Sequence, residues 1–149
     1  MLYNLARAGQ CGKKPLPLMI KPDMDGQGFW AQAALGAGFK AVLFTDIRTP
    51  EDIDEAYRII RPDTPDVRGE HGVKLRRPAL NSYDIEEYLE DLNSIIFCIM
   101  LEKNVAFENI DAVLENAKAK GVDMTQWGPV DFGFSRGEPG LAQSAEIKP

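Results

Sequence analysis

Short apolar runs of strand length alternate along the chain with segments whose apolar residues recur every three to four positions. The predicted strands are residues 16–20, 41–45, 95–102 and 122–128. The predicted helices are residues 26–38, 49–61, 83–93 and 110–121. Short apolar strands that alternate with helices are typical of a parallel sheet covered by helices. The pattern therefore predicts an α/β fold built from roughly four βα units.

The helix at 49–61 carries its own start and stop signals. Thr49 is suited to the N-cap, Pro50 to the first helical position, and Pro62 ends the pattern. Ser82 is the predicted cap of the next helix, at 83–93. Between the two helices, residues 62–81 are rich in proline and glycine, which predicts a long loop. We find no internal boundary, so residues 1–149 are expected to form one domain with 1–14 and 141–149 peripheral or frayed.

The composition of the chain argues against several classes of function. The 149 residues are 44% hydrophobic and 27% charged, which is enough to build a core, and the net charge of -6 disfavours a nucleic-acid surface. The longest apolar run is far shorter than the roughly 20 residues of a membrane helix, and the N-terminus lacks a signal-peptide core. The two cysteines, Cys11 and Cys98, lie in unlike contexts that favour reduced thiols. A cytoplasmic protein without nucleic-acid or membrane partners is expected.

Two carboxylates follow predicted strands. Glu102 ends the strand at 95–102, and Asp131 comes just after the strand at 122–128. Chemistry in βα units collects beyond the carboxyl ends of the strands, and two carboxylates with waters are a usual Mg²⁺ or Mn²⁺ site. The alternative is that each acidic residue caps the helix that follows it. Spacing alone leaves both interpretations open.

The run "IMLEKNVAFENIDAVLENAKAKGVDMTQWGPVDFGFSRGEPG" resembles the strand-helix-strand core of the HpcH/HpaI aldolase/citrate lyase family. These are class II pyruvate aldolases built on a (β/α)8 TIM barrel. The resemblance covers most of residues 16–140. In the family, the Glu of an "IE" strand end and the Asp of a "GP.D" corner bind the divalent metal, and they match Glu102 and Asp131. The backbone N–H groups at that corner hold pyruvate oxygens, which implicates Val130 and Asp131 in substrate binding.

The resemblance implies a carbon-carbon lyase of the aldehyde-lyase class. Such an enzyme cleaves 4-hydroxy-2-oxo acids to pyruvate, or a related 2-oxo acid, and an aldehyde, through an enolate that Mg²⁺ or Mn²⁺ stabilises. It also implies a homo-oligomer. Lys21 stands where the family usually has an arginine, so it is the candidate for the substrate carboxylate, as a point charge. Met100 replaces a usual glutamine, which removes a hydrogen-bonding group from the pocket.

The catalytic histidine of the family belongs to an earlier strand that this chain does not contain. A full barrel typically needs about 250 residues, so the chain corresponds to the middle part of a barrel, with either a longer chain or other subunits completing the sheet. The catalytic base is therefore unknown. His71, the only histidine, lies in the long loop, where a solvated or ion-paired side chain is more common than a base.

Several other side chains could have either a functional role or an ordinary role in solvation or packing. The loop cations Arg68, Lys74, Arg76 and Arg77 suit an anionic substrate tail, although such loops are usually just solvated. Trp30 and Trp127 are expected in the core or a pocket wall, and Cys98 in inert packing.

Two alternative functions stay open. In one, a desolvated Lys21 forms a Schiff base with the substrate. In the other, the chain is a non-catalytic structural or assembly piece of a barrel.

Overall fold

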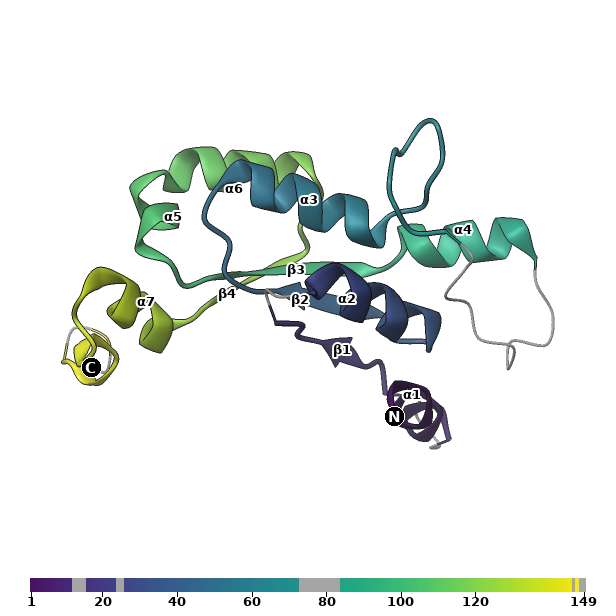
Figure 1. Cartoon of the computed structure of the whole chain (residues 1–149), viewed down its shortest axis with the longest axis horizontal. Coiled ribbons are helices and arrows are strands. Elements are labelled where there is room, and N and C mark those ends of the chain that lie inside the picture. The colour runs from purple at the N-terminus through teal and green to yellow at the C-terminus, as the bar shows by residue number, and fades with distance from the viewer. Residues whose placement is uncertain (12–15, 24–25, 73–83, 146, 148–149) are drawn as a thin grey trace.

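The computed structural model describes residues 1–11, 16–23, 26–72, 84–145 and 147 (Figure 1). Within these residues, four parallel strands form one sheet in which each strand pairs with the next one in sequence. The strands are β1 (Met19–Ile20), β2 (Ala41–Phe44), β3 (Ile96–Leu101) and β4 (Met124–Trp127). The helices are α1 (Leu2–Gln10), α2 (Gln27–Gly36), α3 (Pro50–Ile60), α4 (Ile85–Asn93), α5 (Asn104–Glu108), α6 (Ile110–Ala119) and α7 (Pro129–Arg136), followed by a 3-10 turn, Leu141–Gln143.

The α/β expectation with parallel strands is confirmed. In the ladder, Leu43 lies opposite Cys98, and Cys98 lies opposite Met124. The first strand is shorter than predicted, because only Met19 and Ile20 pair with β2. Pro17 has no backbone N–H to donate to a ladder, which is one physical reason why the apolar run at 16–20 does not all become strand.

Helix caps form at two positions, one predicted and one not. Asp52 accepts hydrogen bonds from the backbone N–H groups of Arg48 and Thr49, at 2.7 and 2.9 Å, so α3 begins where the sequence predicts. The cap of α4 is Asp84, whose carboxylate accepts from the N–H groups of Glu86 and Glu87. Ser82, the predicted cap, lies outside the described residues.

Alternate residues of the strands separate two apolar clusters. The larger one joins one face of the sheet to α2, α3 and α6, which cover that face (Figure 1). At its centre the rings of Phe44 and Phe97 meet edge to face, 5.9 Å apart. The opposite face, which we call the inner face, carries the smaller cluster of Leu43, Cys98 and Met100. Glu102 follows Cys98 and Met100 at the same two-residue period, so it belongs to the inner face.

Arg61 links the end of α3 to the segment just before β3 through hydrogen bonds. Its guanidinium is buried and donates from one nitrogen to the carbonyl oxygens of Leu92, Asn93 and Ile95, at 3.0 to 3.1 Å. These contacts join two parts of the chain that are separated by the long loop. The position of β3 beside α3 therefore does not depend on that loop alone.

Helices α1, α5 and α7 are absent from the sequence prediction. Helix α1 lies in the segment expected to be peripheral, and its Leu2 packs against the buried pair of Ala34 and Phe39. Helix α7 begins at Pro129, a residue preferred at the first helical position, where the sequence suggested only a corner. In the described part of the chain, no helix has the length and apolar content needed to cross a membrane.

Candidate active site

The carboxyl ends of the parallel strands meet at one edge of the sheet, which we call the rim. It is formed by Lys21 after β1, Thr45 and Asp46 after β2, Glu102 after β3, and Gly128 after β4. The connections that lead into α5 and α7 lie at this end in Figure 1. The fold therefore brings together chemically active residues that are far apart in the sequence.

Glu102 is the buried carboxylate of the rim, with only 2% of its surface exposed. One carboxylate oxygen, Oε1, accepts a hydrogen bond from the backbone N–H of Asp46 at 3.0 Å. The other, Oε2, is buried and has no hydrogen-bond partner. A buried carboxylate oxygen without a partner costs folding free energy, which makes Oε2 a candidate ligand-binding atom.

The environment of Glu102 disfavours its charged form. Burial is the largest factor that raises the pKa of the Glu102 carboxyl above its ordinary value, and the nearby carboxylates of Asp131 and Asp46 raise it further. The hydrogen bond from the Asp46 N–H acts in the opposite direction and is outweighed. Asp131 thus lies close enough for the two carboxylates to interact, across the gap between the end of β3 and the start of α7.

Asp46 is a rim residue that the sequence analysis missed. Its backbone is left-handed, with φ of 60°, a conformation that aspartate tolerates better than most residues. Its carboxylate pairs with Lys103 at 2.6 Å and accepts a hydrogen bond from Thr45 at 3.0 Å. Burial raises the pKa of Asp46, but Lys103, Thr45 and Arg48 outweigh it and hold the pKa below its ordinary value. A polar residue directly after the apolar run "AVLFT" was the signal that could have identified it.

Asp131 lies in the first turn of α7 and is exposed to solvent. Its N–H and that of Val130 belong to the first turn of a helix, where backbone N–H groups have no acceptor within the helix. N–H groups at a helix N-terminus can bind an anionic ligand, and the substrate role expected for Val130 and Asp131 stays a prediction. An acidic residue in a first turn also stabilises the helix by itself, so Asp131 as a metal ligand stays a prediction.

Gly128 makes room for the Glu102 carboxylate. A Cβ atom at position 128 would lie 2.7 Å from Oε2 of Glu102 and from the terminal carbon of Met100. We expect Gly128→Ala to cost about 1–3 kcal/mol of unfolding free energy and to displace the carboxylate. Urea denaturation without metal measures the first effect. Gly140→Ala is the matched control, because a Cβ there would meet nothing within 4 Å. Equal stability of the two variants would contradict this account of Gly128.

Lys21 follows β1 at the rim and is exposed to solvent. A lysine becomes a Schiff-base nucleophile at neutral pH when it is desolvated or lies beside another cation. Lys21 is not desolvated by the described residues, so the Schiff-base alternative gains no support from burial and stays a prediction. Its exposed ammonium group is suited instead to attract a carboxylate from solution.

His71 lies at the other end of the sheet. Its backbone pairs with residues 61 and 63, next to the segment before β3, and the loop that carries it is far from α5 and α7 in Figure 1. The imidazole is 2% exposed, so the expectation of a solvated side chain is wrong. Burial lowers the pKa of His71 to about 4. This position separates His71 from the rim and leaves it no contact with Glu102.

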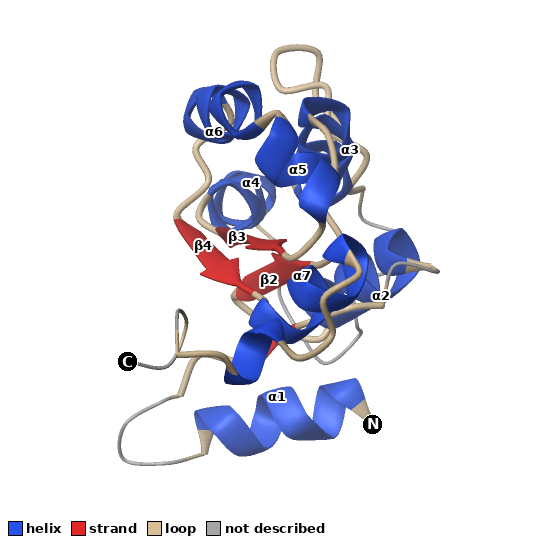
Figure 2. Ribbon diagram, turned by 90° about the vertical axis from the view of Figure 1, so that its left-hand side faces the viewer, coloured by secondary structure: helices blue, strands red, loops and turns tan. Residues whose placement is uncertain are grey.

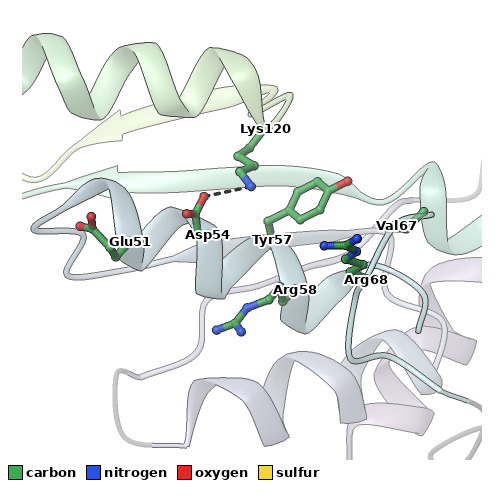
Figure 3. Close-up of a pocket in the computed structure, with 7 residues that line it drawn as sticks. All are labelled: Glu51, Asp54, Tyr57, Arg58, Val67, Arg68 and Lys120. Atoms are coloured by element: carbon green, nitrogen blue, oxygen red, sulfur yellow. Dashed lines mark ion pairs between the residues drawn. The ribbon is translucent and has the colours of Figure 1, made fainter. Parts of the chain in front are cut away.

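Arg68 is also remote from the rim. It lines a cavity of about 460 Å³ on the outer side of α3, together with Tyr57, Arg58 and Lys120 (Figure 3). Lys120 pairs there with Asp54 at 3.0 Å. Arg68 is therefore not placed to bind a substrate at the rim. The other loop cations, Lys74, Arg76 and Arg77, lie outside the described residues.

The remaining expectations have mixed outcomes. Cys98 is buried and unpaired, as expected, and burial, followed by the charge of Asp123, raises its pKa. Cys11 is unpaired and exposed. Of the two positions expected for the tryptophans, the core is excluded, because Trp30 is 48% and Trp127 is 44% exposed, and a pocket wall stays a prediction. The ring of Trp127 contacts Phe132 of α7.

The rim suits a hard divalent cation that takes few protein ligands. Mg²⁺ keeps several waters and commonly uses one or two carboxylates from the protein. Among the described residues, no group of three or more histidine, cysteine or acidic side chains is placed to share a metal. Glu102, with its partnerless Oε2, and the neighbouring Asp131 carboxylate would suit such a cation if water or substrate supplied the other ligands.

Comparisons with solved structures identify proteins that share this fold. The chain superposes on the HpcH/HpaI aldolase from Desulfitobacterium hafniense with a TM-score of 0.76 and 20% identity. It superposes on an HpcH/HpaI aldolase/citrate lyase family protein from Burkholderia cenocepacia with a TM-score of 0.80 and 22% identity. The citrate synthase SbnG gives a TM-score of 0.73 and 17% identity. No family model and no curated protein matches the sequence.

The alignments cover 99% of this chain but only 54%, 56% and 53% of the respective neighbours. The first two neighbours are TIM-barrel aldolases, so the chain has the fold of about half of such a barrel. The expectation of a partial TIM barrel with four parallel βα units is confirmed. At this level of identity the comparisons establish the fold, and the chemistry depends on the residues of the rim.

Proposed function

We propose that the rim is the metal-binding and substrate-binding half of an aldol lyase site. The reaction is the cleavage, or the reverse condensation, of 4-hydroxy-2-oxo acids to give pyruvate or a related 2-oxo acid and an aldehyde. The observation that carries the proposal is the buried, partnerless Oε2 of Glu102 next to Asp131, at the carboxyl ends of parallel strands. The structural neighbours are aldolase and lyase family proteins, which supports this class of chemistry.

Glu102 and Asp131 would hold Mg²⁺ or Mn²⁺ in this proposal. When bound, the cation supplies Lewis acidity toward the negative charge that develops on the 2-oxo acid. The Asp46 N–H orients the Glu102 carboxylate through its 3.0 Å hydrogen bond to Oε1. Lys103 holds Asp46 in turn, so the orientation of Glu102 depends on an ion pair between the ends of β2 and β3.

Two groups would bind the substrate carboxylate and keto oxygens. Lys21 contributes a positive charge at the end of β1, although a lysine cannot make the two-pronged contact of an arginine. The N–H groups of Val130 and Asp131 contribute donors at the N-terminus of α7. We assign no residue of this chain as the base, because His71, the only histidine, lies at the opposite end of the sheet. The unpaired cysteines support a reducing, cytoplasmic location.

Thermal unfolding with metal and pyruvate tests the proposal. A ligand that binds only the folded state at 100 times its Kd stabilises by about 2.7 kcal/mol. For a chain of this size, this raises the Tm by roughly 5–10 °C. We expect Mn²⁺ or Mg²⁺ to raise the Tm, and pyruvate to raise it further only when metal is present.

Other outcomes favour the alternatives. If neither metal nor pyruvate changes the Tm of the chain or of the Glu102→Gln, Asp131→Asn double variant, the non-catalytic interpretation is favoured. If borohydride traps pyruvate on Lys21 and chelator leaves turnover of a 4-hydroxy-2-oxo acid unchanged, the Schiff-base mechanism is favoured. Turnover that chelator abolishes and Mn²⁺ restores supports the metal-dependent lyase.

A further inference from the structure

The chain makes a strained turn at the rim directly after β2. Figure 2 faces this end of the sheet and shows β2 beside β3. Asp46 has a left-handed backbone, with φ of 60°. This conformation is uncommon outside glycine and costs conformational free energy, so surrounding contacts must hold it. The N–H of the same residue donates to Oε1 of Glu102 at 3.0 Å. The shape of the turn therefore decides whether this hydrogen bond forms.

Three side-chain contacts hold the turn. The ammonium group of Lys103 lies 2.6 Å from the Asp46 carboxylate, and the two side chains are only 20% and 22% exposed. The hydroxyl of Thr45 donates to that carboxylate at 3.0 Å, and the guanidinium of Arg48 donates to the Asp46 carbonyl oxygen at 3.2 Å. Lys103 follows Glu102 directly in the chain. The ion pair therefore joins the end of β3, which carries Glu102, to the turn that binds Glu102.

The hydrogen bond makes the two carboxylate oxygens of Glu102 different. Oε1 accepts from the Asp46 N–H, whereas Oε2 is buried and has no hydrogen-bond partner among the described residues. Oε2 lies beside Gly128, because a Cβ atom there would be 2.7 Å from it. The N–H occupies a lone pair of Oε1 and restrains the carboxylate, so Oε2 is the oxygen that the rim offers to a cation.

We infer that Asp46 and Lys103 are positioning residues that make Glu102 a one-oxygen ligand, and that the rim therefore favours Mg²⁺ over Ca²⁺. This rests on the proposed function, in which Glu102 holds the cation. Mg²⁺ commonly takes one or two carboxylates and keeps several waters, whereas Ca²⁺ takes roughly six to eight oxygens and often both oxygens of one carboxylate. Releasing Oε1 would give Glu102 the second oxygen that suits Ca²⁺.

Calorimetric titration with Mg²⁺ and with Ca²⁺ tests the inference. The wild type is expected to bind Mg²⁺ more tightly, and Lys103→Met should reduce the ratio of the two affinities by about 10-fold or more. The ratio is the decisive quantity, because a lost positive charge or a general loosening of the fold affects both divalent cations alike. Lys103→Arg keeps the charge and should retain the ratio. Lys118→Met, at an exposed position of α6, is the matched control and should also retain it.

Two substitutions of Asp46 separate its backbone from its side chain. Both Asp46→Gly and Asp46→Val remove the carboxylate, but only glycine adopts the left-handed conformation without strain. Asp46→Val should lose the preference for Mg²⁺, and Asp46→Gly should keep most of it. Equal affinity ratios in the two variants would contradict a positioning role for the turn. Circular dichroism checks that each variant folds.

Hydrogen exchange of the Asp46 amide, followed by NMR without metal, gives a separate measure of positioning. The amide should be protected in the wild type and in Lys118→Met, and should exchange at least about 10-fold faster in Lys103→Met. Unchanged protection in Lys103→Met, or Mg²⁺ binding with an unchanged affinity ratio, would overturn the inference and leave the proposed function intact. A wild-type protein that binds neither cation would reject the proposed function and the ion preference together.

Discussion

Glu102→Gln is expected to stabilise the metal-free protein and to abolish its stabilisation by metal. In the wild type, Oε2 is buried without a partner, near the Asp131 carboxylate. A glutamine can keep its amide oxygen on the Asp46 N–H and direct its NH2 group toward Asp131. Removing an unsatisfied buried charge in this way is expected to gain about 1–3 kcal/mol.

The direction of the Glu102 pKa shift determines whether protein stability rises or falls with pH. The folded-state pKa is raised, so the folded protein binds this proton more tightly than the unfolded protein does. Ionised Glu102 therefore destabilises the metal-free protein at neutral pH. This penalty disappears as the pH falls through the raised folded-state pKa and below the ordinary value of 4.5. The advantage of Glu102→Gln should disappear over the same range.

The same variant, although more stable without metal, is expected to lose its stabilisation by metal. Glutamine cannot provide the anionic oxygen, so the Tm increase with Mn²⁺ should be lost and turnover should fall at least roughly 100-fold. Glu115→Gln, at an exposed position of α6, is the matched control and should change neither quantity. A metal-free Glu102→Gln protein that is less stable than the wild type would show that the carboxylate has a structural role at the rim.

The contribution of His71 to stability is expected to decrease steeply as the pH falls from 6.5 to 4, opposite in sign to the contribution of Glu102. Burial lowers the pKa of His71 to about 4 and outweighs the backbone of Ile59, which acts in the opposite direction. Between these pH values the unfolded chain binds the proton and the folded chain does not, so stability rises with pH. Over the whole window the difference amounts to about 3 kcal/mol.

Urea denaturation at a series of pH values measures this effect. His71→Leu removes the titrating group and should flatten the pH dependence between 6.5 and 4, while the carboxylates contribute equally to both proteins. Because the chain has one histidine, the difference between the two curves reports on His71 alone. Parallel curves would mean that His71 is accessible to protons in the folded state, contrary to its burial.

The sequence was most informative where local pattern and tertiary burial agree. Helix α3 begins at Pro50 because Thr49, Asp52 and Pro50 all favour that start, and its apolar residues form one stripe. The strand at 96–101 was predicted from an uninterrupted apolar run, and both of its faces are packed against other residues. The position of Glu102 at the rim followed from the same alternation.

Other features depended on contacts that a sequence pattern does not contain. Loop composition suggested a solvated His71, but pairing of its backbone with residues 61 and 63 buries the ring. Asp46 has a role only because the end of β2 lies beside the end of β3, where its N–H reaches Glu102. Trp127 was expected in the core or a pocket wall, and it is exposed because no strand lies beyond β4 among the described residues.

The order of the strands has a consequence for how the protein folds during synthesis. Each strand pairs with the one made just before it, so a new strand can add to a sheet that is already present. None of the four described strands has to wait for a distant segment or insert between two others. This part of the sheet would grow in one direction as it leaves the ribosome, and Glu102 and Asp131 would come together only when β4 is added.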